Sequence, residues 1–130
     1  MGTGRDLWNE WEALYNKQDI AGVASLFTSD GVYITPNFRL DGREAIATFL
    51  REEGKAVSDI NISTSRVIED GDTVVAEWTF RSTQIRPLTW PDGKEMPVTG
   101  VTLELAGVTV GTVKERSFST VHAYYHQRTG

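Results

Sequence analysis

The chain of 130 residues contains no cysteine and no long hydrophobic run. The lack of cysteine excludes a disulfide framework, a thiolate nucleophile and a zinc–thiolate site. No stretch approaches the roughly 18 consecutive apolar residues that a membrane-spanning helix needs, and the first residues carry no apolar signal core. We therefore expect a soluble, cytoplasmic protein.

Positive charge is also scarce. The chain has 13 Lys and Arg against 18 Asp and Glu, which gives a net charge of -5, and no basic run interrupts this balance. An acidic surface repels nucleic acid, so the composition argues against nucleic-acid binding. A chain of this length with 39% hydrophobic residues fits one domain, which we expect to span residues 1–130.

Histidine is limited to two residues, and both lie in the last predicted strand, Phe118–Gln127. Successive side chains of a strand point to opposite faces, so Phe118, His122, Tyr124 and His126 are expected on the same face. Imidazoles suit proton transfer near neutral pH, which makes both histidines candidate catalytic residues. The alternative is that His126 is a solvated residue close to the chain end.

A metal site is not expected from these histidines. Their spacing of four residues on a strand separates them by roughly 13 Å along the chain. No carboxylate lies close to them in sequence. We therefore predict no metal ligands.

The first half of the chain has helical periodicity. Apolar residues at spacings of three and four predict an amphipathic helix over residues 5–17. Asp19 can cap a second helix, which is expected to end at residues 29–31. An Asp-x-x-Glu capping box predicts a third helix over residues 41–54, with a glycine at its end.

The second half alternates between apolar and polar residues, which predicts β-structure. The predicted strands cover residues 32–35, 60–70, 73–85, 98–113 and 118–127. A change of parity predicts a bulge at 65–67, and the glycine at 106–107 predicts a bulge or a bend there. An Asp-Gly pair predicts a hairpin turn at 70–71. Residues 86–97, with three prolines, are expected to form an exposed loop over a pocket mouth.

Helices followed by one meandering antiparallel sheet predict an α+β domain in which the sheet curls around the helices. Five motifs carry a family resemblance: WEALYNKQDIAGVASLF (11–27), DGVYITP (30–36), DGREAI (41–46), VAEWT (75–79) and YYH (124–126). With them the chain resembles the nuclear transport factor 2-like superfamily, and within it the SnoaL-like polyketide cyclases, ketosteroid isomerases and limonene epoxide hydrolases. The resemblance implies a cone-shaped roll of three N-terminal helices on a curved, mostly antiparallel sheet.

The same resemblance excludes two chemistries. The donor Tyr and the basic carboxylate of ketosteroid isomerases fall on Trp11 and Thr35, and a threonine hydroxyl is no general base near neutral pH. Tyr33 resembles a tyrosine of limonene epoxide hydrolases, but their Arg and Asp fall on Trp78 and Phe80. Neither catalytic set is therefore complete in this chain.

Where the family often carries an Asp in the last strand, this chain has His126. The resemblance places this position inside the cone, which favours His126 as acid or base, assisted by His122 and Tyr33. An aromatic pocket is expected around them, with the substrate-binding residues Trp11, Tyr15, Thr35, Phe49, Trp78, Phe80 and Tyr124. Such a wall suits a flat hydrophobic ligand, for example a polyketide, a terpenoid or a steroid-like compound.

Two classes of function remain open. The first is an enzyme without a cofactor that uses proton transfer for cyclisation, isomerisation or dehydration. The second is a non-catalytic module that binds a hydrophobic ligand or another copy of itself. On the predicted strand 73–85, Val75, Glu77, Thr79 and Arg81 form a half-apolar outer face, and together with the resemblance they predict a homodimer through this face.

Overall fold

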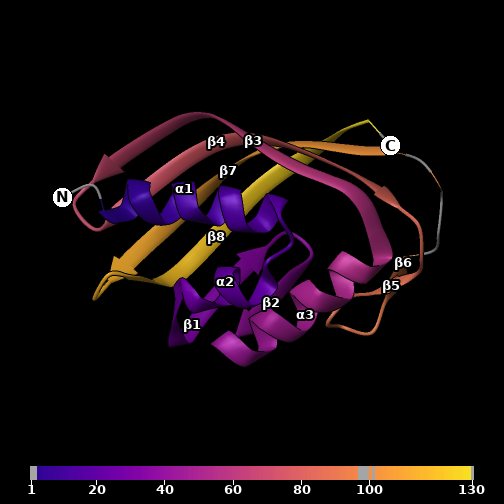
Figure 1. Cartoon of the computed structure of the whole chain (residues 1–130), viewed down its shortest axis with the longest axis horizontal. Coiled ribbons are helices and arrows are strands. Elements are labelled where there is room, and N and C mark those ends of the chain that lie inside the picture. Colours follow the sequence, from indigo (N-terminus) through magenta and orange to yellow (C-terminus); the bar gives the residue numbers. More distant parts are fainter. Residues whose placement is uncertain (1–2, 97–99, 101, 130) are drawn as a thin grey trace.

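Three helices pack on one curved sheet in the computed structural model, which describes residues 3–96, 100 and 102–129. All three helices lie on the same side of the sheet (Figure 1). The helices are α1 (Thr3–Asn16), α2 (Ile20–Ser25) and α3 (Arg43–Ala56). The strands are β1 (Phe27–Thr35), β2 (Phe38–Asp41), β3 (Val57–Asp70), β4 (Thr73–Gln84), β5 (Leu88–Thr89), β6 (Glu95–Met96), β7 (Thr102–Lys114) and β8 (Ser117–Thr129).

The main sheet has six strands in the order β2-β1-β8-β7-β4-β3. Its pairs are antiparallel except for β1 and β8, which run parallel. The short strands β5 and β6 pair only with each other and form a small hairpin beside α3 (Figure 1). This architecture confirms the predicted α+β roll.

Helix α1 is fixed on β3 by polar side chains as well as by its apolar stripe. The Trp8 indole N–H donates to Thr64 Oγ1 at 2.8 Å, and Glu12 accepts from the Thr64 backbone N–H at 2.8 Å. One turn further on, the Asn16 amide donates to Ile62 O at 2.9 Å and accepts from Ile62 N at 2.7 Å. The aromatic stripe of α1 is thereby held over the concave face of the sheet.

Strand β8 contains a bulge at Ser119 that the sequence pattern did not predict. Phe118 and Thr120 pair with consecutive residues of β7, so Ser119 is an extra residue in the ladder. The bulge reverses the parity of the strand. Phe118 is buried, and beyond the bulge Val121 and Ala123 are buried on the same side. The even-numbered residues of the strand therefore face outward after this point.

Of the bulge or bend expected at residues 106–107, the bulge is wrong, because β7 pairs with both β4 and β8 through this region without a register shift. Gly107 instead lies between Trp78 on β4 and Tyr125 on β8. A Cβ atom on Gly107 would lie 2.7 Å from the Tyr125 Cβ and 3.0 Å from the end of the Trp78 indole. The glycine thus leaves room for these two rings, whose centroids are 6.1 Å apart. Residues 98, 99 and 101 of the predicted strand lie outside the described residues.

The capping box predicted for the third helix is also wrong. Asp41 belongs to β2, and its Oδ1 forms a salt bridge of 3.1 Å with Arg39 Nη2. Helix α3 begins only at Arg43. The residue before the helix is Gly42, at φ 96°, and no side chain caps α3. The helix continues past the predicted end to Ala56.

Other local predictions are confirmed. Asp19 caps α2 by accepting from Gly22 N at 3.0 Å. The pairing of β3 with β4 shifts between Thr64 and Arg66, where a bulge is predicted. The turn after Asp70 contains Gly71 at φ 59°. Helix α2, however, ends earlier than predicted, and β1 runs through residues 29–31, where the helix was expected to stop.

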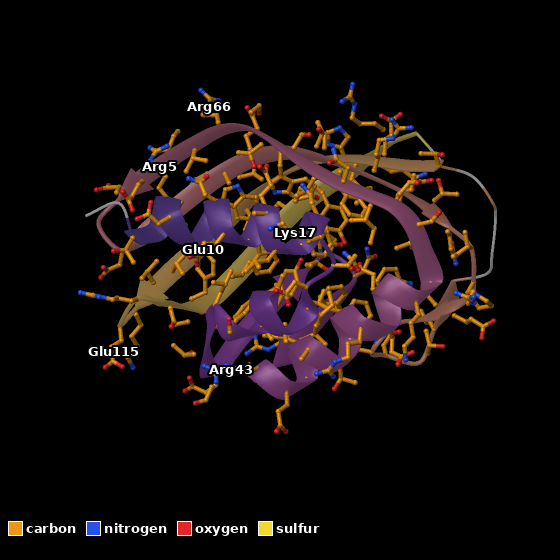
Figure 2. All side chains as sticks on the ribbon, in the orientation of Figure 1. Arg5, Glu10, Lys17, Arg43, Arg66 and Glu115 are labelled. Carbon is orange, nitrogen blue, oxygen red and sulfur yellow. The ribbon has the colours of Figure 1, made fainter. Side chains whose placement is uncertain are left out.

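Charged side chains project outward around the molecule, as Arg66 on β3 and Glu115 in the β7–β8 turn illustrate (Figure 2). None of the helices in the described part of the chain is long and apolar enough to cross a membrane. The described residues also contain no group of three or more His, Asp or Glu that could hold a metal ion.

Candidate functional site

A cavity of about 580 Å³ opens between the concave face of the sheet, α1, α3 and the β5–β6 hairpin. Its volume lies within the usual range of small-molecule sites. Aromatic and aliphatic side chains form much of its wall. The aromatic residues that line it are Trp8, Trp11, Tyr15, Tyr33, Phe38, Trp78, Phe80, Trp90 and Tyr125.

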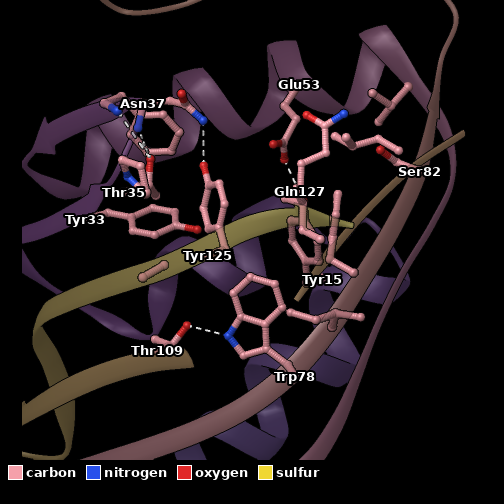
Figure 3. Close-up of a pocket in the computed structure, with 18 of the residues that line it drawn as sticks. Tyr15, Tyr33, Thr35, Asn37, Glu53, Trp78, Ser82, Thr109, Tyr125 and Gln127 are labelled. Atoms are coloured by element: carbon pink, nitrogen blue, oxygen red, sulfur yellow. Dashed lines mark hydrogen bonds between the residues drawn. The ribbon is translucent and has the colours of Figure 1, made fainter. Parts of the chain in front are cut away.

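Glu53 on α3 is the carboxylate of this cavity (Figure 3). Its Oε1 accepts a hydrogen bond of 2.7 Å from the Tyr15 hydroxyl. Burial removes solvent from the charged form and raises the pKa of Glu53, while the hydrogen bond from Tyr15 acts in the opposite direction. A carboxyl group whose pKa is moved toward neutrality can both accept and donate a proton.

Three phenols line the cavity together with this carboxylate. The pKa values of Tyr15, Tyr33 and Tyr125 are all raised, in each case mainly by burial and further by the charge of Glu53. All three therefore remain protonated at neutral pH and can act as hydrogen-bond donors. All three line the same cavity as Glu53.

Tyr33 is the phenol with a free donor. Its ring lies edge-on to Trp11 and to Phe38, with centroid distances of 5.4 Å in both cases. Among the described residues its hydroxyl has no hydrogen-bond partner. Figure 3 shows the hydroxyl directed into the cavity. This O–H group is therefore available to a bound molecule.

The third phenol, Tyr125, is held by the turn between β1 and β2. Its hydroxyl accepts from Asn37 Nδ2 at 2.8 Å. Thr35 supports this corner, because its Oγ1 accepts from the backbone N–H groups of Asn37 and Phe38 at 3.1 and 3.3 Å. Thr35 thus shapes the turn between β1 and β2 as well as lining the cavity.

Six of the predicted site residues come together in this cavity, namely Trp11, Tyr15, Tyr33, Thr35, Trp78 and Phe80. Trp78 also donates its indole N–H to Thr109 Oγ1 at 2.8 Å, which fixes the orientation of its ring. Phe49 is not part of the wall. It is buried behind Phe38 and Trp90, at centroid distances of 4.6 and 5.9 Å.

The three remaining predicted residues, His122, Tyr124 and His126, lie on the outer face of the sheet. Tyr124 is 53% exposed, and its ring stacks on His122 with a centroid distance of 4.1 Å. The Tyr124 hydroxyl and His122 Nδ1 are 3.0 Å apart. His126 is exposed. The expectation that His126 points into the cone is therefore wrong, because the bulge at Ser119 turns this side of β8 outward.

Glu53 was missed by the sequence analysis, although a signal for it exists. Ile46, Phe49 and Leu50 face the core from α3, and Glu53 follows Ile46 by seven residues on the same helical face. The charged run Arg51-Glu52-Glu53 is typical of a solvated helix surface, and this pattern masks the signal. Tyr125 was missed because the bulge changed the parity of β8.

Comparison with known proteins agrees with this architecture. The chain is similar to a protein of ketosteroid isomerase-like fold from Catenulispora acidiphila in complex with trimethylamine, with 16% identity, a TM-score of 0.72, and coverage of 92% of this chain and 84% of that one. It is similar to TerC co-crystallised with polyporic acid, with 19% identity, a TM-score of 0.76, and coverage of 95% and 92%. It is also similar to an LEH-like epoxide hydrolase from M. tuberculosis, with 18% identity, a TM-score of 0.74, and coverage of 95% and 82%.

These similarities define the fold as nuclear transport factor 2-like, the class that includes the ketosteroid isomerase-like proteins. The family described as SnoaL-like domain matches residues 8–126. The chain belongs to this SnoaL-like family, which confirms the resemblance in the sequence motifs. No curated protein is similar enough in sequence to match the chain.

The raised pKa of Glu53 predicts a pH-dependent difference in stability between the wild type and Glu53→Gln. Below the ordinary value of 4.5 the carboxyl group is protonated in the folded and unfolded states, so folding buries no charge at this position. As the pH rises from this value through the raised folded pKa, the wild type loses stability relative to Glu53→Gln. Urea melts at pH values from about 4 to 8 measure this difference. The control variant Glu52→Gln, at an exposed neighbouring position, should follow the wild type at every pH. A difference between the wild type and Glu53→Gln that does not change with pH would contradict the burial of the Glu53 charge.

Proposed function

We propose that the chain is an enzyme without a cofactor that binds a small, largely apolar molecule in the cavity and transforms it by proton transfer. Glu53 acts as the acid or base in this proposal, and Tyr33 supplies a hydrogen bond to an oxygen of the substrate. The single observation that supports it best is the placement of one carboxylate, bound by Tyr15 at 2.7 Å, inside an aromatic cavity. Enzyme sites commonly combine a buried titratable group with a few polar atoms in an apolar pocket.

The arrangement suits abstraction of a proton next to a carbonyl group. Glu53 would accept the proton from carbon, and the Tyr15 hydroxyl would hold its carboxylate in one orientation. The negative charge that develops on the carbonyl oxygen would be stabilised by the free O–H of Tyr33. Because burial keeps the pKa of Tyr33 above its ordinary value, this hydroxyl remains a donor at neutral pH. Return of the proton at another carbon would complete an isomerisation. Attack of the enolate carbon on a second carbonyl of the same molecule, with return of the proton to the alkoxide that forms, would complete an aldol cyclisation.

The substrate class in this proposal is a flat hydrophobic compound such as a polyketide, a terpenoid or a steroid-like molecule. The aromatic lining supports it, since ring faces pack well on planar ligands. TerC was co-crystallised with polyporic acid, which gives a precedent for a small organic ligand on this fold. The alternative is a non-catalytic binding module. The position of both histidines outside the cavity favours it, but Glu53 provides the base that an enzyme needs.

Isotope exchange tests the proposed chemistry without knowledge of the natural substrate. In D₂O, proton NMR follows the exchange of the protons next to the carbonyl of a ring-fused ketone such as 2-tetralone. We expect the wild type to accelerate exchange and Glu53→Gln to lose about a hundredfold or more of this acceleration. Tyr33→Phe should lose about tenfold or more because it removes only the hydroxyl donor.

The matched control for this test is Glu52→Gln, which removes a neighbouring carboxylate that is exposed and paired with Lys55. It should exchange at the wild-type rate. Ketone binding without any exchange would favour the binding module, and equal exchange by wild type and Glu53→Gln would contradict the role of Glu53.

We further propose that the chain forms a homodimer through the outer face of the sheet. Several apolar side chains there lack contacts from the helices. This outer sheet patch consists of Ile68, Val75, Val108, Val110 and Tyr124, of which Ile68 and Tyr124 are 52% and 53% exposed. An exposed apolar patch of this kind is typical of an association surface.

Light scattering coupled to size exclusion tests the dimer. We expect the wild type at micromolar concentration to have twice the 14.5 kDa mass of one chain. Val108→Glu places a charge in the middle of the outer sheet patch and should yield monomers. Ser25→Glu, at an exposed position on α2, is the control and should remain a dimer. A monomeric wild type would refute this proposal.

A further inference from the structure

The charge of the cavity is unbalanced. Glu53 is the one carboxylate among the described residues that line it, and no Lys, Arg or His is present in that lining. The partner of Glu53 is the neutral hydroxyl of Tyr15. By contrast, the adjacent Glu52 lies outside the cavity and pairs with Lys55 at 3.4 Å. The site therefore contains a half-buried carboxylate charge with no cationic side chain beside it in the described part of the lining.

Such a charge is costly for a protein to keep. Buried carboxylates are normally paired with a cation, because an isolated charge loses its hydration without compensation. Three side-chain amides line the cavity, those of Asn37, Gln84 and Gln127, but an amide cannot neutralise a carboxylate. A cationic group on the ligand would compensate Glu53 directly.

The remaining wall also suits a cation. All four tryptophans of the chain line the cavity. Aromatic faces attract alkylammonium groups, most strongly when the ring is tryptophan and the site is shielded from water. At the same time these rings accept apolar carbon, so they would contact the methyl or methylene groups around a charged nitrogen.

We infer that the cavity takes a small apolar molecule with one positively charged nitrogen, that is, a tertiary or quaternary amine whose cation is paired with Glu53 and enclosed by the aromatic wall. This inference rests on the proposed function only in using the same cavity as the ligand site. It narrows the substrate class from hydrophobic compounds in general to hydrophobic amines. The net charge of -5 further favours the approach of cations.

A pair of isosteric probes tests the inference. Benzyltrimethylammonium carries a permanent charge, and neopentylbenzene has the same shape with carbon in place of nitrogen. Because all four tryptophans line the cavity, their fluorescence reports binding of either probe. We expect the wild type to bind the cation about tenfold or more tightly than the neutral probe, whereas Glu53→Gln binds the two with similar affinity.

Glu52→Gln is the matched control, because it changes the net charge of the chain equally but leaves the cavity unaltered. It should keep the wild-type preference for the cation. Loss of the preference in Glu52→Gln as well would mean that overall charge, not Glu53, selects the cation, and the inference would be overturned. Retention of the preference in Glu53→Gln would also overturn the inference, because the preference would then not depend on Glu53.

Probe binding and ketone exchange can fail independently, which separates this inference from the proposed function. If the wild type binds both probes equally, the amine class is refuted, while ketone exchange that depends on Glu53 would still support proton transfer. If neither probe changes the fluorescence of the wild type, the inference is likewise refuted. A preference for the cation with no ketone exchange would support the amine class and refute the proposed chemistry.

Discussion

The carboxylate of Glu53 is enclosed by aromatic rings, and one phenol, Tyr15, donates to it at 2.7 Å. Enclosure in an apolar wall disfavours its charged form, which raises its pKa and makes it sensitive to any donor or cation that enters the cavity. The same charge adds to the effect of burial, which is the main cause of the raised pKa values of the three phenols in the cavity. The proposed chemistry and the proposed ligand class both follow from this one placement.

The scaffold around Glu53 explains how a single sheet can form such a site. Polar contacts of Glu12 and Asn16 hold α1 on β3, so the aromatic stripe of the helix closes one side of the cavity. Gly107 allows Trp78 and Tyr125 to meet on the floor. The β5–β6 hairpin adds Trp90 beside Phe49. Each of these features helps to form the cavity on the concave face. The convex face remains available for association.

Sequence patterns predicted the fold because helical and alternating periodicities extend over long segments and depend on burial alone. The site was harder to predict. Its aromatic wall was largely recognised, since Trp11, Tyr15, Trp78 and Phe80 belong to clear apolar stripes. The two histidines were assigned to the wrong face because one bulge residue, Ser119, reverses the parity of β8, and a bulge has no reliable local signature. Glu53 was overlooked because its neighbours Arg51 and Glu52 are charged, although its helical spacing places it inside.

The central claim is that the Glu53 carboxyl group is buried with a raised pKa, and its direct titration is the most stringent test. Carbon-13 labelling of glutamate side chains allows each carboxyl resonance to be followed by NMR against pH, and the signal absent from Glu53→Gln identifies Glu53. The account predicts a titration midpoint clearly above the ordinary value of 4.5. A midpoint at or below 4.5 would show a solvated or ion-paired carboxylate and would contradict the account.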